Sequence, residues 1–533
     1  MQSNGLGFHH PAAFWTGCAA ITLGVLAHLP MFVHASHMGY QMAGMEMDAT
    51  MLTGMGLIPF GLLLAAWGML PRLPAAWNGS GTAGAPLLFH VADGAALNRE
   101  HWKLVLVLVI ALTVDVQKPA TLGFVMPGLI GEYGIGKGTA GLLALVALTG
   151  TTVGSVLWGR IADRYGRRAA ILLSALMFIG TAICGAMPSF EWNLVMCFLM
   201  GASAGGLLPI TFTLMAETVP AAHRGWLLVA LGGIGTSAGY LLAAGAAAVL
   251  EPLFSWRVLW LLGLPTGALI IFLDRYIPES PRFLARAGMQ HEARAVLAKF
   301  CGVVDTLPAG AAAQETAPGL TGRRGGSRAF ITFGLVCSGL AWGMVNFGFL
   351  LWLPTSLGSM GLDPAAASAL LARSALLALP GTLLVIWLYH RWSSIKTLVL
   401  FILLTAVALL AFFAASVAGI RSAPVMIGII ALLLFCASGV IAMLIPYAAE
   451  IYPADQRATG SGVVAASSKA GGILGAAGGV LGVFGNLGLS ALLIALPLVL
   501  AAGLLLRSGI ETRGRRLKQI QESLVGKGGM GSA

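Results

Sequence analysis

The chain has 533 residues, of which 58% are hydrophobic and only 10% are charged, and its formal net charge is +11. A soluble protein carries about a quarter charged residues, so this composition excludes an ordinary soluble enzyme. The excess of Lys and Arg does not indicate a nucleic-acid partner, because these residues lie at the ends of apolar runs, where basic side chains fix membrane orientation. We therefore expect a polytopic membrane protein.

Apolar stretches long enough to cross a bilayer as helices, about 20 residues each, recur about fourteen times. Their approximate ranges are 13–33, 50–70, 103–128, 140–158, 169–187, 193–216, 226–249, 258–273, 329–353, 365–389, 397–417, 425–448, 459–482 and 488–506. The pattern predicts an all-α membrane protein, with the lipid bilayer as its surroundings.

The distribution of Lys and Arg over the connecting segments predicts the orientation of the chain. With the N-terminus placed in the cytoplasm, cytoplasmic segments hold 25 of the 31 basic residues and periplasmic segments hold 3. Cytoplasmic loops of membrane proteins carry an excess of basic residues. We expect an inner (plasma) membrane protein with both termini in the cytoplasm, and a first apolar run that is retained as a helix and not cleaved as a signal peptide.

The first two spans, in residues 1–100, form a hairpin whose predicted periplasmic turn is rich in methionine and histidine. His34, His37, Met38 and Met42 lie in this turn. Thioether and imidazole groups are suitable ligands for Cu(I), so these four residues are candidate metal ligands. Methionine is also an adaptable filler of apolar cores, and no tight ligand motif repeats here. The sequence leaves both interpretations open.

Four ionisable residues lie well inside predicted spans: Asp115, Lys118, Arg373 and Lys469. A charge that faces lipid costs several kcal/mol, so each side chain is expected to face a cavity or a partner. One interpretation is structural, because Asp115 and Lys118 are one helical turn apart and can form an ion pair. The other is a cationic cavity with a single titratable acid, which suits an organic anion and a proton.

Ten residues between the fourth and fifth runs form a basic turn with characteristic glycine and aspartate positions. They read Gly159-Arg160-Ile161-Ala162-Asp163-Arg164-Tyr165-Gly166-Arg167-Arg168. The arginines alone follow the charge rule for cytoplasmic loops. In addition, Asp163 can accept hydrogen bonds from free N–H groups at a helix N-terminus, and Gly166 permits a sharp turn. The decamer, here called the signature loop, resembles the signature loop of the major facilitator superfamily.

The two halves of the chain also repeat, on either side of a polar stretch at 274–328. The motif Glu217-x-x-Pro220-x-x-x-Arg224 recurs as Glu450-x-x-Pro453-x-x-x-Arg457 at an offset of 233 residues, which also relates Gly206 to Gly439 and Gly239 to Gly472. Repeated halves place a transporter's substrate site between them, near the middle of the membrane. The expected division is a hairpin at 1–100, six-helix bundles at 101–273 and 329–507, a cytoplasmic loop at 274–328 and a basic tail at 508–533.

The family resemblance implies that the signature loop latches the two bundles together on the cytoplasmic side. The residues expected to act in gating are Gly159, Asp163, Arg164, Gly166, Arg167, Arg168, Glu217, Arg224, Glu450 and Arg457. The equivalent turn of the second half, from Tyr389 to Lys396, has neither the Asp nor the Gly.

Three further stretches narrow the resemblance to the branch of sugar porters, organic-ion transporters and aromatic acid:proton symporters. They are Pro278–Leu284, the segment Gly205-Gly206-Leu207-Leu208-Pro209 with Glu217 and Arg224 after it, and Gly123–Pro127 with Glu132 to Ile135. Aromatic acid symporters carry two acids in their first span. Asp115 matches the first of these acids, whereas Lys118 replaces the second.

The same resemblance implies roles for the charges inside the spans. An arginine in the penultimate span of aromatic acid symporters is thought to hold the substrate carboxylate, and Lys469 stands at that position. We therefore expect Lys469, Lys118 and Arg373 to bind an organic anion and Asp115 to carry the coupling proton. Trp342, Phe347 and Tyr447 are candidates for stacking on a ring, because they lie in spans that are expected to line the cavity.

The expected function is secondary active transport by alternating access: the proton-coupled uptake of a small organic carboxylate, with aromatic carboxylates among the candidates. No phosphate-binding Gly-x-x-x-x-Gly-Lys-Ser/Thr motif occurs, and nothing indicates covalent chemistry, so we expect neither an enzyme nor a cofactor. Two alternatives stay open from the sequence. One is an efflux antiporter for drugs or organic cations, and the other is a transporter-like sensor with a metal-binding hairpin.

Overall fold

A computed structural model of the chain describes residues 9–69, 95–301, 326–359, 361–420, 422–452, 457–483 and 486–512. Throughout this described part, the regular elements are helices. Thirteen of them are long and apolar enough to cross a membrane, and Val258–Phe272 is a shorter apolar segment. These segments coincide with the apolar runs of the sequence, so the prediction of an all-α membrane protein is confirmed.

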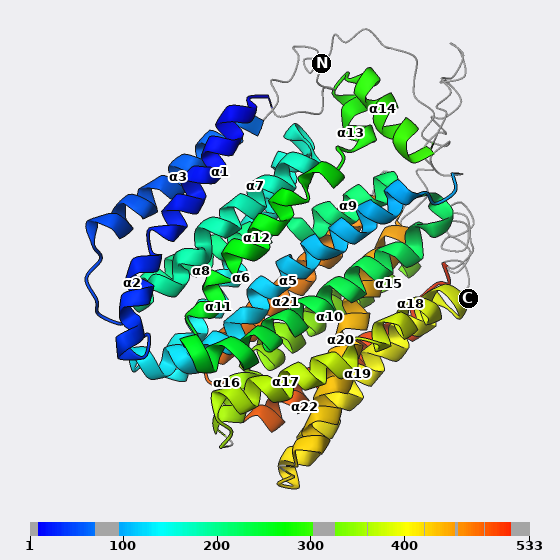
Figure 1. The fold of residues 1–533 in the computed structure, drawn as a ribbon. Helices are drawn as coiled ribbons and strands as arrows, with labels where there is room; N and C mark the ends of the chain where they lie inside the picture. Colours follow the sequence, from blue (N-terminus) through cyan, green and yellow to red (C-terminus); the bar gives the residue numbers. More distant parts are fainter. Residues whose placement is uncertain are drawn as a thin grey trace.

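The chain begins with a helical hairpin that packs against one side of the body (Figure 1). Its elements are α1 (Pro11–Leu26), α2 (Leu29–His34), the short 3₁₀-helix η1 (Ala35–Met38) and α3 (Ala49–Met69). Glycines let α1 and α3 approach closely: a side chain at Gly17 would lie 2.6 Å from the Gly61 carbonyl oxygen. Small residues at such interfaces are typical of membrane helix pairs. The hairpin contacts α7 of the first bundle.

The first bundle occupies the middle of the chain and includes six spanning segments. Its helices are α5 (Arg99–Tyr133), α6 (Lys137–Tyr165), α7 (Arg167–Gly180) with η3 (Thr181–Ala186), α8 (Phe190–Ala204), α9 (Leu207–Thr218), α10 (Ala221–Phe254), α11 (Val258–Leu261), α12 (Gly263–Phe272) and η4 (Asp274–Tyr276). Asn98 starts α5, because its side chain accepts hydrogen bonds from the N–H groups of Glu100 and His101. Helices α8 and α9 form one span that is interrupted between them.

Two short helices follow the first bundle, α13 (Pro281–Arg286) and α14 (Gln290–Cys301), and the second bundle comes after them. Its elements are α15 (Gly326–Met344), the π-helical turn η6 (Val345–Phe349), η7 (Leu350–Trp352), α16 (Leu353–Ser359), α17 (Pro364–Ala378), α18 (Gly381–Arg391), α19 (Ser394–Val417), α20 (Ala423–Ile451), α21 (Arg457–Val480) and α22 (Leu487–Ser508). Helix α14 packs on the start of α5, where Asn98 donates to the Phe300 carbonyl at 2.8 Å.

The sequence repeat corresponds to equivalent packing in the two bundles. The missing side chain of Gly239 on α10 leaves room for Val116 of α5, and that of Gly472 on α21 leaves room for Phe347 of η6. Helices α10 and α21 thus approach the first helix of their own bundle in the same way. Across the bundles, α10 packs on α17 and α20, and α21 packs on α6.

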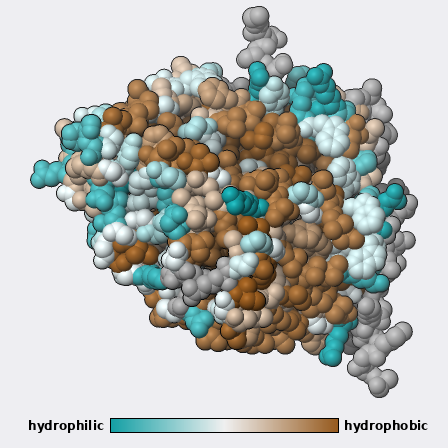
Figure 2. All heavy atoms as spheres, turned by 60° about the horizontal axis from the view of Figure 1, so that its bottom comes forward, coloured by the Kyte–Doolittle hydropathy of each residue, from teal (hydrophilic) through white to brown (hydrophobic). Residues whose placement is uncertain are grey.

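The outer surface of the bundles is apolar over a wide area. Many large hydrophobic side chains are exposed there, for example Leu106, Phe272, Phe333 and Leu500. Figure 2 shows one face of the molecule, on which hydrophobic residues form a broad area and hydrophilic residues gather mainly toward its margins. A surface of this kind is typical of a protein that lipid surrounds.

Candidate functional site

A cavity of about 1140 Å³ lies between the two bundles. Its walls include α5, α9 and α10 from the first bundle and α15, α20 and α21 from the second. At one end its lining includes Glu217, Arg224, Arg282, Arg391 and Glu450, and several residues at this end are exposed. This is the end that the basic-residue distribution predicts to face the cytoplasm.

At the opposite end the bundles touch through glycines. The position of a side chain on Gly123 of α5 lies 2.7 Å from the carbonyl oxygen of Leu351, and the equivalent position on Gly138 of α6 lies 2.9 Å from that of Val480. The two bundles thus approach each other backbone to backbone at this end, whereas exposed residues line the cavity at the signature-loop end.

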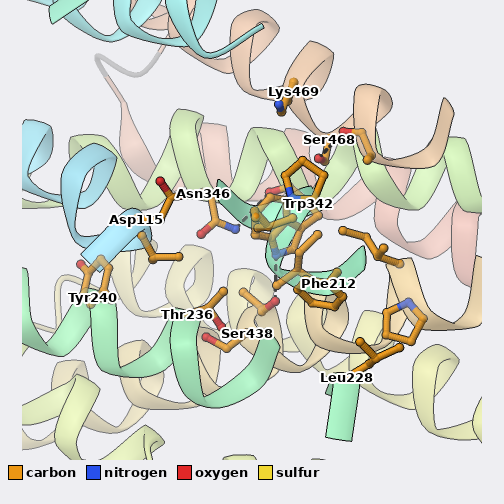
Figure 3. Close-up of a pocket in the computed structure, with 18 of the residues that line it drawn as sticks. Asp115, Phe212, Leu228, Thr236, Tyr240, Trp342, Asn346, Ser438, Ser468 and Lys469 are labelled. Atoms are coloured by element: carbon orange, nitrogen blue, oxygen red, sulfur yellow. Dashed lines mark hydrogen bonds between the residues drawn. The ribbon is translucent and has the colours of Figure 1, made fainter. Parts of the chain in front are cut away.

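Lys469 of α21 places the ammonium group in this cavity (Figure 3). Its Nζ donates a hydrogen bond to the carbonyl oxygen of Gly205 at 3.2 Å. Gly205 belongs to the first bundle, so this bond joins the two halves. The side chain is partly buried, and a partly desolvated cation in a cavity attracts anions more strongly than one in water.

Asp115 of α5 also lines the cavity, and its side chain is almost fully buried. Its Oδ1 lies 3.5 Å from Nζ of Lys118. Leu208, at the start of α9, and Lys469 line the same cavity as this carboxylate. The structure thus brings together the acid and one of the three basic residues that we expected in the cavity.

The other two basic residues lie elsewhere. Lys118 is fully buried beside the Phe178 ring, 4.0 Å from the ring centroid, and does not line the cavity. Its position fits the structural interpretation of the Asp115–Lys118 pair. Arg373 on α17 is exposed on the outside of the second bundle and does not line the cavity either. In this conformation neither residue lines the cavity, so the expectation that they bind the substrate stays a prediction without support from the cavity lining.

Aromatic and polar side chains complete the walls. Trp342 and Phe347 line the cavity as expected, with ring centroids 6.4 Å apart in an edge-to-face arrangement. Tyr447 does not line it, because this residue is fully buried and its hydroxyl donates to the Ile510 carbonyl at 2.7 Å. Tyr240 was missed by sequence reasoning. This residue lines the cavity, and its buried hydroxyl has no hydrogen-bond partner among the described residues.

The signature loop joins α6 to α7 at the open end of the cavity. Gly166 adopts a φ of +105°, a conformation that strongly favours glycine. Arg167 contacts Glu217 at 3.4 Å and Asp163 at 3.5 Å, and Arg168 makes two bonds of 2.7 Å to Asp274. These partners all belong to the first bundle. In this conformation the signature loop therefore makes stabilising contacts within the first bundle.

The carboxylate at the N-terminus of α7 belongs to Glu279, not to Asp163. Glu279 accepts hydrogen bonds from the backbone N–H of Arg167 at 2.7 Å and of Arg168 at 3.3 Å. The side chain of Asp163 is 80% exposed and, among the described residues, forms an ion pair with the Arg167 side chain. Our interpretation of Asp163 as the helix-capping acid is therefore corrected. The sequence feature that could have indicated Glu279 as the capping residue is the family motif Pro278–Leu284, which contains it.

The remaining gating candidates lie around the cavity mouth. Glu450 accepts hydrogen bonds from the hydroxyls of Tyr389 at 3.0 Å and Thr512 at 2.6 Å. Arg224 donates to the Val219 carbonyl at 3.3 Å. Gly159 lies inside α6 with open space around it, and the side chain of Arg164 is exposed. Arg457 starts α21, but its side chain lies outside the described part of the chain.

The methionine-rich turn packs against the first bundle through an apolar cluster. This cluster contains Met31, Phe32, Ala35, Met42, Met51 and Ala186. Met42 is fully buried, whereas His34, His37 and Met38 are exposed. In the described residues no three His, Cys, Asp or Glu side chains form a group able to hold a metal. The position of Met42 fits the core-filling interpretation, whereas His34, His37 and Met38 do not fill the core.

A buried ion pair that sequence reasoning missed anchors the same turn. Glu132 Oε1 accepts hydrogen bonds from the backbone N–H groups of Met42 at 2.7 Å and Ala43 at 3.0 Å. It also pairs with the fully buried Arg257 at 2.7 Å. One carboxylate thus joins the hairpin to the end of α5 and the start of α11. In the sequence, Glu132 belongs to the stretch from Glu132 to Ile135, which indicated the family resemblance but not this ion pair.

Comparisons with known proteins agree with this architecture. The sequence profile described as Major Facilitator Superfamily matches residues 104–476 and 331–526. The chain is 27% identical over 453 residues to the niacin transporter of Acinetobacter baylyi, which covers 80% of this chain and 98% of the relative. It is 28% identical over 432 residues to a 4-hydroxybenzoate transporter of Pseudomonas aeruginosa, covering 78% and 94%.

Two further comparisons extend this result. The gallate transporter of Pseudomonas putida is 27% identical over 429 residues, covering 78% of this chain and 94% of the relative. Among solved structures, a partially occluded inward open conformation of the xylose transporter from E. coli matches with a TM-score of 0.63. That match has 19% sequence identity and covers 79% of this chain and 100% of the other. It shows a shared fold.

Proposed function

Because the chain belongs to the Major Facilitator Superfamily, we propose that it takes up a small organic carboxylate, coupled to protons, by alternating access between its two bundles. The observation that carries this proposal is the ammonium group of Lys469 in the cavity between the bundles. A cation held at that depth is costly unless it has a functional partner, and a carboxylate is the complementary ligand.

The substrate class is an aromatic or heteroaromatic monocarboxylate. Trp342 and Phe347 offer ring faces and edges beside the cavity, and the Tyr240 hydroxyl offers a hydrogen bond to a polar ring substituent. Relatives that transport niacin, 4-hydroxybenzoate and gallate support this choice, since all three compounds combine a ring with a carboxylate.

Asp115 is the proposed proton carrier. It is the acid that lines the middle of the cavity, and Lys469 and Lys118 are the cations whose charges act on it. Protonation would remove the negative charge that competes with substrate for Lys469. Proton and anion would therefore favour each other's binding, which is the basis of symport.

The proposal is tested with purified protein in liposomes. Labelled benzoate, nicotinate and 4-hydroxybenzoate should accumulate when the outside is acidic and the inside neutral, and a protonophore should abolish accumulation. Tetraphenylphosphonium serves as the organic cation. If this cation is driven by the pH gradient while none of the three carboxylates is transported, the chain is a cation antiporter and the proposal fails.

A further inference from the structure

The helix of the fourth span of the first bundle is interrupted where α8 ends and α9 begins. Gly205 and Gly206 lie between these helices, and Pro209 follows in the first turn of α9. Proline has no N–H, so the Gly205 carbonyl cannot accept the usual bond from the residue four positions later. It accepts instead from the Ser155 hydroxyl at 2.7 Å and from Lys469 Nζ at 3.2 Å.

Asp115 of α5 and Leu208, in the first turn of α9, line the same cavity as this carbonyl. A helix start leaves N–H groups without intrahelical acceptors. The interruption therefore offers a backbone acceptor to the proposed anion-binding group, Lys469, close to the proposed proton carrier. Figure 3 shows that Asp115 and Lys469 approach the cavity from different helices.

The sequence repeat shows that the fold does not require this turn. The offset of 233 residues relates Gly205 to Ser438 and Pro209 to Ala442. Yet the equivalent helix of the second bundle, α20, continues without interruption from Ala423 to Ile451. The same offset relates Lys469 to Thr236, which is neutral. The second bundle thus lacks an interruption like that between α8 and α9, and the position equivalent to Lys469 carries no charge.

We propose that the Gly205 carbonyl acts as a surrogate ligand, which occupies Lys469 in the empty carrier and is displaced when a substrate carboxylate binds. This inference rests on the proposed function. An empty carrier must close around Lys469 when it reorients, and a buried ammonium without a partner is strongly disfavoured. The carbonyl dipole offsets part of this cost. A carboxylate is the stronger acceptor for an ammonium group, so substrate replaces the carbonyl. Gly205 and Pro209 are therefore positioning residues.

Transport assays can separate the empty carrier from the loaded one. Net efflux of labelled benzoate from liposomes into benzoate-free buffer requires the empty carrier to return, whereas exchange against external benzoate does not. Pro209→Ala supplies the missing N–H, which competes with Lys469 for the Gly205 carbonyl. We expect net efflux to fall about tenfold while exchange stays within about twofold of wild type, as for the loss of one hydrogen bond to a charged group.

Two control variants sharpen the test. Pro446→Ala restores an N–H inside α20, where the Ala442 carbonyl makes no hydrogen bond to a lysine of the described residues. It should leave the ratio of net efflux to exchange unchanged. Ser155→Ala removes the other donor to the Gly205 carbonyl, so net efflux should hold or rise with exchange unchanged. This variant carries the test if Pro209→Ala does not fold.

The outcomes separate this inference from the proposed function. Equal losses of net efflux and exchange in Pro209→Ala, or a fall in net efflux in Ser155→Ala, would overturn the surrogate-ligand role while leaving carboxylate transport standing. A ratio in Pro446→Ala that falls as far as in Pro209→Ala would also overturn it. If wild-type protein exchanges neither benzoate nor nicotinate, the proposed function itself fails, and the surrogate role with it.

Discussion

The carboxylate of Glu279 accepts a hydrogen bond of 2.7 Å from the backbone N–H of Arg167, a residue 112 positions earlier in the chain. This bond closes the signature loop over the N-terminus of α7. Gly166 makes the contact possible, because a side chain at this position would collide with Glu279 Oε2. The loop and the segment after the sixth span of the bundle are therefore one structural unit, although the sequence shows them as two separate motifs.

The first prediction concerns the pH dependence of this unit. Burial raises the pKa of the Glu279 carboxyl group from 4.5 to about 7. The backbone hydrogen bonds from Ser280, Arg167 and Arg168 and the positive charge of Arg167 lower this pKa, but their effect is smaller than that of burial. A raised pKa in the folded state means that the folded protein binds the proton more tightly than the unfolded chain. The stability contribution of Glu279 is therefore lost as the pH rises from about 4.5 through about 7.

Glu279→Gln should remove this dependence. The difference in melting temperature, wild type minus Glu279→Gln, should decrease steadily as the pH rises from 4.5 to about 7, the interval between the two pKa values. Melting curves of the purified protein in detergent measure it. A difference that stays constant or increases over this range would contradict the buried, proton-binding state of Glu279.

The second prediction concerns the signature loop as a gate. Asp163 is 80% exposed and touches Arg167 only at 3.5 Å, so Asp163→Asn should change the melting temperature little. If the loop joins the bundles in the opposite conformation, the same variant should slow benzoate transport markedly. Glu191→Gln, a change of the same type at a helix start outside the loop, is the matched control. Wild-type rates in Asp163→Asn would remove this residue from the gating set.

The third prediction distinguishes core filling from metal binding in the hairpin. Met42 is fully buried and Met38 is 48% exposed. Met42→Ala should lower stability by about 2–5 kcal/mol, as expected for a large-to-small change in a core, whereas Met38→Ala should have little effect. Thermal unfolding with and without Cu(I) measures both. A stabilisation by Cu(I) that is lost in both variants would favour the metal-binding sensor instead.

The sequence predicted the spans well because hydrophobic length is a strong local signal. It also located Asp115 and Lys469 on cavity-lining helices. It could not decide which way Lys118 and Arg373 point, because helix rotation is set by packing: Lys118 lies against Phe178, and Arg373 faces outward. The anchoring role of Glu132 was equally hidden, since its partners are backbone N–H groups of a turn about 90 residues away.

The last prediction separates the anion anchor from the proton carrier. Lys469→Ala should weaken benzoate binding by about 2–5 kcal/mol, the range for truncating one partner of a buried charge pair. Lys469→Arg should keep much of the affinity, because a guanidinium also binds carboxylates. Arg373→Ala is the matched control: it also removes a basic residue from a span, but from the outer surface of α17, and it should bind like wild type.

Asp115→Asn should behave differently from all three variants. An amide cannot release and rebind a proton, so benzoate exchange should persist while accumulation driven by a pH gradient is lost. Lys118 would lose its ion-pair partner but keep its position beside Phe178. Isothermal binding and liposome uptake measure the two effects on the same preparations. If Lys469→Ala binds benzoate normally and Asp115→Asn instead loses binding of tetraphenylphosphonium, the cavity recognises cations, because the acid and not the lysine would then be the group that contacts the ligand.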